Sequence, residues 1–285
     1  MENEMKIGAL SSSLRKPFPV MLETYARMGL KGIQVLAEPE FLVADDTRLA
    51  AYKALIDQYG LVVSAVCGDV CRTHFSVALE WEDRVRVHKH VVDLAAKLDS
   101  HIITTHIGVV PEDQNDPVYE MMAKSLKAAA EYSASRGAVL AVETGPEKAE
   151  TLCQLLDDID SKGIGVNLDP ANLRMVACVD GAHAVKVLGK YIVHTHAKDG
   201  INIVPGSPAA AYGIIEPDGS RRKFAEERSQ YKEVPLGEGQ VEWDSYLAAL
   251  KEVGFDGFLT IERECGEDPE GDIRKAYNFL MNKLA

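Results

Sequence analysis

Residues 138–169, AVLAVETGPEKAETLCQLLDDIDSKGIGVNLD, contain a short apolar run, an amphipathic stretch and a second apolar run. The first run, Val139–Glu143, and the last, Gly165–Asp169, show little polar alternation, as is typical of strands buried on both faces. Lys148–Ile159 between them spaces its apolar residues as a helix does. The segment therefore predicts one strand–helix–strand unit with two parallel strands.

The same unit recurs along the whole chain. The other strand-like runs are Lys6–Leu10, Gly32–Leu36, Val62–Cys67, Ile102–His106, Ile192–His196 and Phe258–Glu262. The other helical patterns lie near Val20–Met28, Arg48–Tyr59, Glu82–Leu98, Val118–Arg136, Ala182–Leu188, Trp243–Val253 and Asp272–Lys283. We expect an α/β protein with a (βα)₈ barrel in a single domain, residues 1–285, because such barrels use about 250 residues. A doubly wound nucleotide-binding sheet is disfavoured, since neither GxGxxG nor a Walker A sequence follows the first strand.

The connection between the seventh and eighth strands is unusually long. Gly200–Pro235 is rich in Gly, Pro, Ser and charged residues. Connections of this length within a compact domain are uncommon and are usually functional or disordered. We therefore expect a long loop insertion after strand seven that serves as a lid or as an oligomer arm.

The charge balance limits the partners. The chain has 31 Lys and Arg against 44 Asp and Glu, a formal net charge of −13, which would repel a phosphate backbone. We therefore expect no nucleic-acid partner. The N-terminal sequence MENEMK lacks the features of a signal peptide, and no apolar run is long enough to span a membrane. A cytoplasmic protein without a membrane partner is expected, and a sugar, a sugar phosphate or a metal ion remains compatible with the charge.

Ionisable residues end the later strands of the predicted barrel. In a parallel barrel every strand delivers its carboxyl end to the same mouth, where active sites lie. Each of these residues alone could be a helix cap or a core residue, but their recurrence on successive strands favours one shared site. Three carboxylates and one imidazole suit Mn²⁺, Mg²⁺ or Co²⁺, and Zn²⁺ is also compatible. The predicted ligands are Glu143, Asp169, His196 and Glu262.

Five segments of the chain resemble a known family. They read AVETGPE, GVNLDPANL, VHTHAKDG, VPLGEGQVEWDSYLAAL and GFDGFLTIERE. They resemble the xylose-isomerase-like TIM-barrel family of sugar and sugar-phosphate isomerases and epimerases, which also includes hydroxypyruvate isomerase-like and inosose dehydratase-like proteins. The resemblance extends from Lys6 to the last helix and is specific for the fold and the metal site, whereas it leaves the substrate open.

The resemblance implies a mechanism. The metal ligands of the family fall on the residues named above, with His196 preferred to His194 because it precedes an x-Lys-Asp sequence. Ketose epimerases of the family use their two metal-bound glutamates as acid and base, which implies these roles for Glu143 and Glu262. The reaction is proton abstraction next to a carbonyl, through an enediolate stabilised by the metal. Oligomers are common in this family.

Five further residues are predicted to contact the substrate: His106, Asn172, His194, Lys198 and Glu238. The resemblance implies that His106 lines the substrate site, whereas His194 shares a strand face with the ligand histidine. Asn172 replaces a histidine that family members often carry, and it can hydrogen-bond a hydroxyl group. Lys198 could orient the substrate or pair with a neighbour. Glu238 lies in a turn that either lines the site or only enters a helix.

Other polar residues have more ordinary interpretations. Asp69 and His74 follow the third strand and could reach the mouth or serve the loop. His88 and His90 lie in a helix rich in Lys and Arg, where a solvated face is expected.

Three functions fit these observations. The first is a metal-dependent isomerase or epimerase of a sugar or sugar phosphate. The second is a dehydratase of an inosose-type keto-polyol on the same site, and the third is a non-catalytic sugar-binding barrel. A DNA-repair nuclease is disfavoured, because the remaining histidines do not fall into the ligand motifs of a zinc cluster and the net charge is −13.

Overall fold

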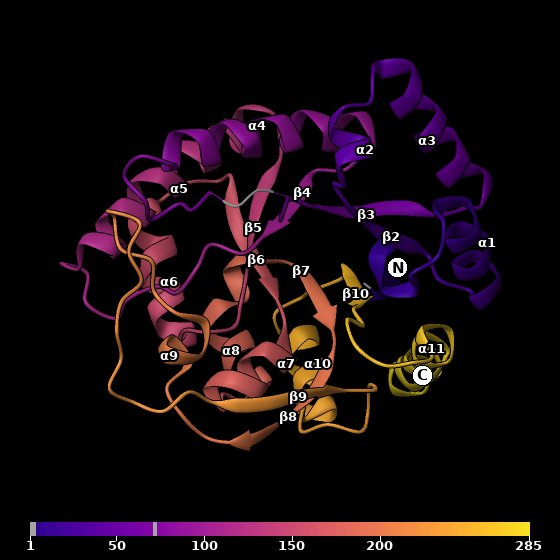
Figure 1. Ribbon diagram of the computed structural model, residues 1–285. Coiled ribbons are helices and arrows are strands. Elements are labelled where there is room, and N and C mark those ends of the chain that lie inside the picture. Colours follow the sequence, from indigo (N-terminus) through magenta and orange to yellow (C-terminus); the bar gives the residue numbers. More distant parts are fainter. Residues whose placement is uncertain (1–3, 71–72) are drawn as a thin grey trace.

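A closed barrel of eight parallel strands forms the centre of the molecule (Figure 1). The computed structural model describes residues 4–70 and 73–285. Around the barrel the strands follow the order β1-β10-β7-β6-β5-β4-β3-β2. They are β1 Lys6–Leu10, β2 Gly32–Leu36, β3 Val62–Cys67, β4 Ile102–Thr105, β5 Val139–Glu143, β6 Ile164–Leu168, β7 Ile192–Ala197 and β10 Phe258–Ile261. Each of the eight predicted strands is confirmed to within one residue at either end, and so is the (βα)₈ fold.

Helices surround the barrel as an outer layer, which Figure 1 shows as a ring. The long ones are α1 Phe18–Met28, α3 Asp46–Gln58, α4 Trp81–Lys97, α5 Pro117–Ser135, α6 Ala149–Ile159, α8 Gly181–Leu188, α10 Trp243–Glu252 and α11 Pro269–Leu284. Shorter helical segments are Ser11–Leu14, α2 Pro39–Leu42, α7 Pro170–Asn172, a π-helical turn at Leu173–Ala177, and Gly189–Tyr191. No helix in the described ranges is long and apolar enough to cross a membrane.

The core lies between the strands and this helical layer. Helix α1 is an example: Leu22 and Tyr25 on its inner face are fully buried, and the Tyr25 hydroxyl donates to the carbonyl of Leu10 at 2.8 Å. The helix ends at Gly29, whose φ of 96° is a left-handed conformation that costs glycine little.

The expectation of a solvated face is wrong for His88. This side chain on α4 is 1% exposed, and its Nε2 lies 2.8 Å from the hydroxyl of Ser133 on α5. His90 does lie on an exposed face, with Nε2 2.8 Å from the carbonyl of Leu42. The spacing of apolar residues did not distinguish the buried His88 from the exposed His90, because both faces of α4 carry charged side chains.

The insertion after β7 is not an irregular loop. It contains an antiparallel hairpin, β8 Asp199–Val204 with β9 Gln230–Val234, and a short helix, α9 Pro208–Tyr212. The sequence did not predict the hairpin because its two short strands are separated by a long connection and pair with each other outside the barrel. The insertion itself is confirmed, whereas its role as an oligomer arm remains a prediction.

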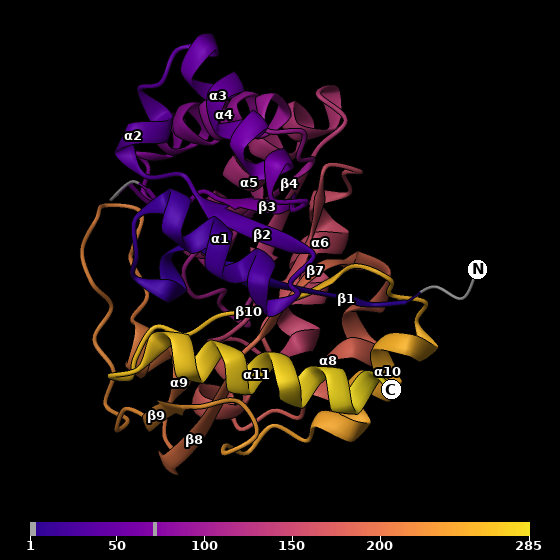
Figure 2. The ribbon, with the colours of Figure 1, turned by 90° about the vertical axis from the view of Figure 1, so that its right-hand side faces the viewer.

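The insertion is anchored on the mouth of the barrel. The N–H of Ala78, between β3 and α4, donates to the carbonyl of Pro217 at 2.8 Å. Arg222 pairs with Asp116 at the start of α5 at 2.7 Å. In Figure 2 the long connection between β8 and β9 lies at the left, opposite the start of β1 at the right. The carboxyl ends of the strands point to this side, so the insertion partly covers the site that they form.

Candidate metal centre

Four neighbouring strands bring the predicted ligands together. Glu143 is the last residue of β5, Asp169 directly follows β6, His196 lies in β7, and Glu262 directly follows β10. Because β5, β6, β7 and β10 are consecutive in the barrel, their ends converge on one point. Each of the four side chains is buried and offers a ligand atom, and these atoms lie within 4.8 Å of one another.

One ring nitrogen of His196 faces all three carboxylates. Its Nδ1 lies 3.4 Å from Oε1 of Glu143, 3.5 Å from Oδ2 of Asp169 and 3.2 Å from Oε2 of Glu262. One oxygen of each acid therefore converges with one imidazole nitrogen. This is the arrangement that a divalent cation with oxygen and nitrogen ligands requires.

The opposite ring nitrogen of His196 is held by Gln34. Nε2 lies 2.8 Å from Oε1 of Gln34 on β2, and the amide nitrogen of Gln34 in turn donates to the hydroxyl of Thr104 at 2.7 Å. An amide oxygen can only accept, so Nε2 of the histidine carries a proton, and Nδ1 is the nitrogen left to face the carboxylates and any cation among them. Hydrogen bonds of this kind orient metal-ligating histidines and fix their tautomer.

Two buried polar atoms of the cluster lack hydrogen-bond partners in the described residues. They are Oδ2 of Asp169 and Nδ1 of His196. The other oxygen of Asp169 caps α7, accepting the N–H groups of Ala171 and Asn172 at 2.8 and 2.9 Å. Since buried polar atoms are nearly always satisfied, this pair of orphans indicates a group that the residues are built to hold. Three carboxylates and an imidazole fit Mn²⁺, Mg²⁺ or Co²⁺.

The charges of the cluster depend on one another. Burial raises the pKa of Glu262, but His196 and Lys198 outweigh it and hold that pKa well below the usual range. Burial lowers the pKa of His196, and Glu262 and Glu143 raise it well above the ordinary value. The Nζ atom of Lys198 lies 2.9 Å from Oε2 of Glu262 and 2.5 Å from Oε2 of Glu264. Glu262 is therefore held ionised by two neighbouring cationic groups.

A cavity of about 520 Å³ opens onto the cluster. Within the cluster, Glu143 and Glu262 line this cavity, whereas Asp169 and His196, 0% and 1% exposed, lie beneath them. A volume of this size is typical of small-molecule sites. The lining residues are His106, Glu143, Asn172, Met175, Lys198, Tyr212, Tyr231, Lys232, Glu233, Glu262, Glu264 and Cys265.

Three of the five predicted substrate contacts reach the cavity, namely His106, Asn172 and Lys198. The Asn172 amide donates to Oε1 of Glu143 at 3.0 Å, so it already holds one of the glutamates in place. Nε2 of His106 lies 3.5 Å from the same oxygen. Glu143 raises the pKa of His106 to about 10, burial opposes this rise, and the hydrogen bond with Asp69 adds to it.

The other two predicted contacts, His194 and Glu238, lie elsewhere. His194 is 1% exposed below the cluster, with Nδ1 2.9 Å from Oδ1 of Asn167 and Nε2 3.0 Å from the hydroxyl of Thr260. His194 and His196 point to the same face of β7, as predicted. His194 precedes His196 by two residues and therefore lies deeper in the barrel. Glu238 is exposed and pairs with Lys275 of α11.

Several residues of the site were not predicted from the sequence. Gln34 belongs to β2, and its approach to β7 results from closure of the barrel. Tyr212, Tyr231 and Lys232 come from the insertion, whose fold was not predicted. The sequence offered one signal for these residues, namely aromatic and basic side chains within the insertion. Composition alone does not specify which of these side chains point into the cavity.

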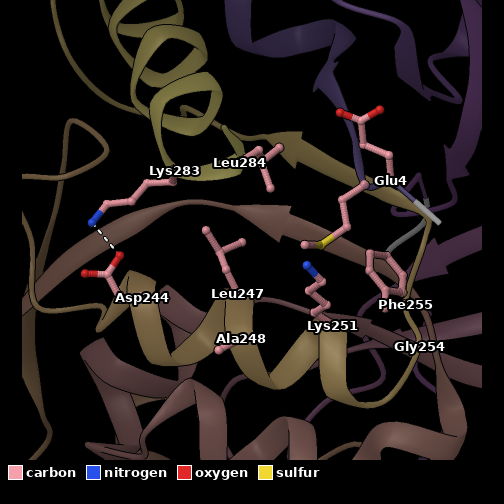
Figure 3. Close-up of a pocket in the computed structure, with 10 residues that line it drawn as sticks. Glu4, Asp244, Leu247, Ala248, Lys251, Gly254, Phe255, Lys283 and Leu284 are labelled. Atoms are coloured by element: carbon pink, nitrogen blue, oxygen red, sulfur yellow. Dashed lines mark hydrogen bonds and ion pairs between the residues drawn. The ribbon is translucent and has the colours of Figure 1, made fainter. Parts of the chain in front are cut away.

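A larger cavity lies away from the metal ligands. It has a volume of about 860 Å³ and is bordered by α10, α11 and the residues before β1 (Figure 3). Lys283 and Asp244 form an ion pair across it at 2.6 Å. The clusters of metal-ligating groups found among residues 4–70 and 73–285 do not include any residue of this cavity.

Comparison with known proteins agrees with this architecture. Residues 22–283 match the model of the xylose isomerase-like TIM barrel family. The chain spans 62% and 42% of the lengths of two curated relatives, to which it is 23% and 27% identical in the matched parts.

Solved structures extend the likeness over the whole chain. A xylose isomerase domain protein from Planctomyces limnophilus is 25% identical, with a TM-score of 0.78 over 98% of this chain and 96% of that one. The probable 3-DHS dehydratase AsbF from Bacillus anthracis is 17% identical, with a TM-score of 0.75 over 98% and 99% of the two chains. A D-psicose 3-epimerase solved in the presence of D-fructose is 18% identical, with a TM-score of 0.70 over 98% and 97%. With its closed barrel and the family match over residues 22–283, the chain belongs to the xylose isomerase-like TIM barrel family.

Proposed function

We propose that the protein is a divalent-metal-dependent isomerase or epimerase of a sugar or sugar phosphate. The observation that carries the proposal is the division of the ligand cluster, in which Glu143 and Glu262 line the cavity and Asp169 and His196 lie beneath it. Two carboxylates that reach both an ion and the substrate can transfer protons at a carbon held next to that ion.

The two glutamates approach the cavity from well-separated strands. Glu143 ends β5 and Glu262 follows β10, and β6 and β7 lie between these strands in the barrel. One carboxylate can remove a proton from one face of a carbon and the other can return it on the opposite face, which inverts the centre. Glu262 is ionised and therefore available to accept a proton at neutral pH, since His196 and Lys198 hold its pKa low.

A bound divalent cation supplies Lewis-acid stabilisation of the charge that develops on the substrate oxygens when the proton leaves. The chain's own residues do the rest. Asn172 orients Glu143 through its amide, Lys198 holds Glu262, and His106 offers Nε2 at the cavity beside Glu143.

The insertion provides the means to recognise the substrate. Tyr212 and Tyr231 line the cavity, and aromatic rings pack well against the apolar faces of sugar rings. Lys232 also lines it, and among the described residues no carboxylate lies within ion-pair distance of its ammonium group. A free ammonium group suits an anionic substituent, so phosphorylated sugars belong in the substrate panel.

Dehydration of a keto-polyol is the second candidate, and the position of Lys198 favours it. This buried ammonium group lines the cavity 2.9 Å from Oε2 of Glu262. After Glu262 removes the proton next to the carbonyl, Lys198 could donate a proton to the departing β-hydroxyl group, which leaves as water.

A solvent-isotope experiment tests both candidates. The protein loaded with Mn²⁺, Mg²⁺ or Co²⁺ is incubated in D₂O with ketoses, aldoses, their phosphates and keto-polyols, and the products are followed by NMR. Epimerisation by two bases puts deuterium at the reacting carbon of the product before it appears in the remaining substrate. Dehydration instead gives an enone with loss of water.

Two variants identify the acid and base. Glu143→Gln and Glu262→Gln should each lower turnover by about 10²–10⁴-fold. Glu150→Gln is the matched control, because Glu150 is exposed on α6, pairs with His183 and does not line the cavity. Full turnover by Glu262→Gln would contradict the two-glutamate mechanism, and absence of any reaction across the panel would favour the sugar-binding barrel.

A further inference from the structure

Asp69, in the loop after β3, makes a compact set of contacts at the mouth of the barrel. Its Oδ2 lies 2.6 Å from Nδ1 of His106. Its Oδ1 accepts the hydroxyl of Thr105 at 2.6 Å and the backbone N–H of His106 at 3.0 Å. Both oxygens of this carboxylate are thus committed to the end of β4.

A buried arginine supports this arrangement. Arg84 of α4 is 4% exposed, its guanidinium lies 4.5 Å from the ring centre of Phe75, and it donates to the hydroxyl of Thr105. It also lies 3.9 Å from Oδ1 of Asp69. The Thr105 hydroxyl therefore accepts from the arginine and donates to the aspartate, which leaves the carboxylate a single orientation.

The orientation of Asp69 determines that of His106. A carboxylate can only accept, so the proton of the 2.6 Å contact lies on Nδ1 of the ring, whether the ring is neutral or charged. Nε2 is thereby turned away from the loop, to a position 3.5 Å from Oε1 of Glu143 at the cavity.

We propose that Asp69 is a positioning residue, which holds His106 with Nε2 directed at the substrate oxygen that lies beside Glu143. The inference deepens the proposed function and rests on it for the identity of the substrate, a sugar carbonyl or hydroxyl group. It accounts for a buried arginine and a carboxylate at the mouth that the metal cluster does not use.

A second cation between Asp69, His106 and Glu143 is the competing explanation, since these three groups are close enough to hold one. The hydrogen bonds argue against it. Nδ1 of His106 and Oδ2 of Asp69 face each other, and Oδ1 of Asp69 already accepts two further hydrogen bonds. Asp69 therefore satisfies its oxygens within the protein, unlike Asp169, whose Oδ2 lacks a partner among the described residues.

Asp69→Asn is the variant that separates these explanations. An asparagine has the same shape but one acceptor oxygen. If that oxygen keeps the two donors now on Oδ1, its NH₂ group faces Nδ1 of His106 and forces the ring proton to Nε2. The ring then adopts the wrong tautomer, as happens when the aspartate of a catalytic triad is replaced by asparagine.

The first measurement does not need turnover. In ¹⁵N-labelled protein, NMR should find a proton bonded to Nδ1 of His106 in the wild type, whereas in Asp69→Asn Nδ1 should lose its proton and Nε2 alone should carry one. Asp93→Asn is the control, because Asp93 accepts comparable bonds from Tyr132 and Arg136 on the outer surface of α4 and α5. An unprotonated Nδ1 in the wild type would overturn the proposal, even if the proposed sugar chemistry were correct.

The second measurement uses kinetics. Once a substrate is found, Asp69→Asn should lower kcat/KM by about 10–100-fold, the usual cost of losing an orienting partner. Asp69→Asn added to His106→Gln should cause no further loss, because Asp69 acts through that histidine. A further loss of tenfold or more in the double variant would overturn the proposal.

The number of bound metal ions tests the competing explanation, in which Asp69 is a ligand of a second cation. The wild type and Asp69→Asn should bind the same number of Mn²⁺ ions in a titration. Loss of one ion in Asp69→Asn would make Asp69 a ligand and overturn its positioning role. Failure of every substrate in the panel would contradict the proposed function alone, since the NMR result would still stand.

Discussion

Nε2 of His196 lies 2.8 Å from Oε1 of Gln34, a contact between β7 and β2 across the interior of the barrel. It fixes the ring so that Nδ1 faces the three carboxylates. The ligand cluster is therefore completed by a residue that is not itself a ligand.

Gln34→Met should weaken the metal site. Methionine is similar in shape, but it offers His196 no strong acceptor, so the ring loses its fixed tautomer. We expect the affinity for Mn²⁺ to fall about 10–100-fold, measured by isothermal titration calorimetry. Gln154→Met on the exposed face of α6 is the control, and an unchanged affinity in Gln34→Met would refute the orienting role.

Removal of the metal should destabilise the protein. In the metal-free state three buried carboxylates face one imidazole, and two of the ligand atoms lack partners among the described residues. A cation that binds the folded state stabilises it by about 2.7 kcal/mol when its concentration is 100 times the dissociation constant. The melting temperature should rise with Mn²⁺ and fall with a chelator, and the rise should vanish in Asp169→Asn.

Acid should destabilise the fold through His88. Burial lowers the pKa of this histidine to about 3, and Arg84 adds to the effect, so the ring stays neutral in the folded state. The unfolded chain takes up the proton near pH 6.5. The stability is therefore complete above pH 6.5 and falls progressively as the pH drops toward 3, by about 2 kcal/mol at pH 5.

His88→Gln tests this assignment. Urea unfolding at pH 7.5 and at pH 5 should show a smaller loss of stability in this variant than in the wild type. His90→Gln serves as the control, because His90 lies on the exposed face of the same helix. Equal pH dependence in the wild type and His88→Gln would exclude His88 as the source.

Arg222→Ala should loosen the insertion. Arg222 pairs with Asp116 at 2.7 Å and with Glu216 at 2.6 Å, which connects the insertion to the start of α5. These pairs are partly exposed, so the global stability should change by about 1 kcal/mol or less. Limited proteolysis should nevertheless cut the connection between α9 and β9 faster. Arg274→Ala, which removes an exposed pair within α11, should leave the cleavage rate unchanged.

The barrel could be predicted from the sequence because each strand and helix carries its own local pattern. The apolar run Val139–Glu143 and the helical spacing of Lys148–Ile159 need no distant partner to be recognised. The convergence of Glu143 and Glu262 followed from the rule that parallel strands end at one mouth. The family match confirms the fold and the structure brings the four ligands together, whereas their catalytic roles remain a proposal.

Other features depend on contacts between distant segments and could not be read locally. The hairpin of the insertion pairs residues that lie far apart in the sequence, such as Asp199 with Val234. Asp199 also accepts the backbone N–H of Gly237 and the indole N–H of Trp243, at 2.9 and 3.0 Å. The positions of His194 and Glu238 were misjudged for the same reason, since spacing along the chain does not give depth within the barrel.

Closure of the barrel is what makes the centre competent. All four predicted ligands come from the second half of the chain. The residues that orient His196 come from the first half: Gln34 hydrogen-bonds the histidine, and Thr104 hydrogen-bonds Gln34. A chain in which the halves have formed separately would possess every ligand and still bind the ion weakly. We therefore expect uptake of metal to report on folding, because it should occur only after the two halves of the barrel have joined.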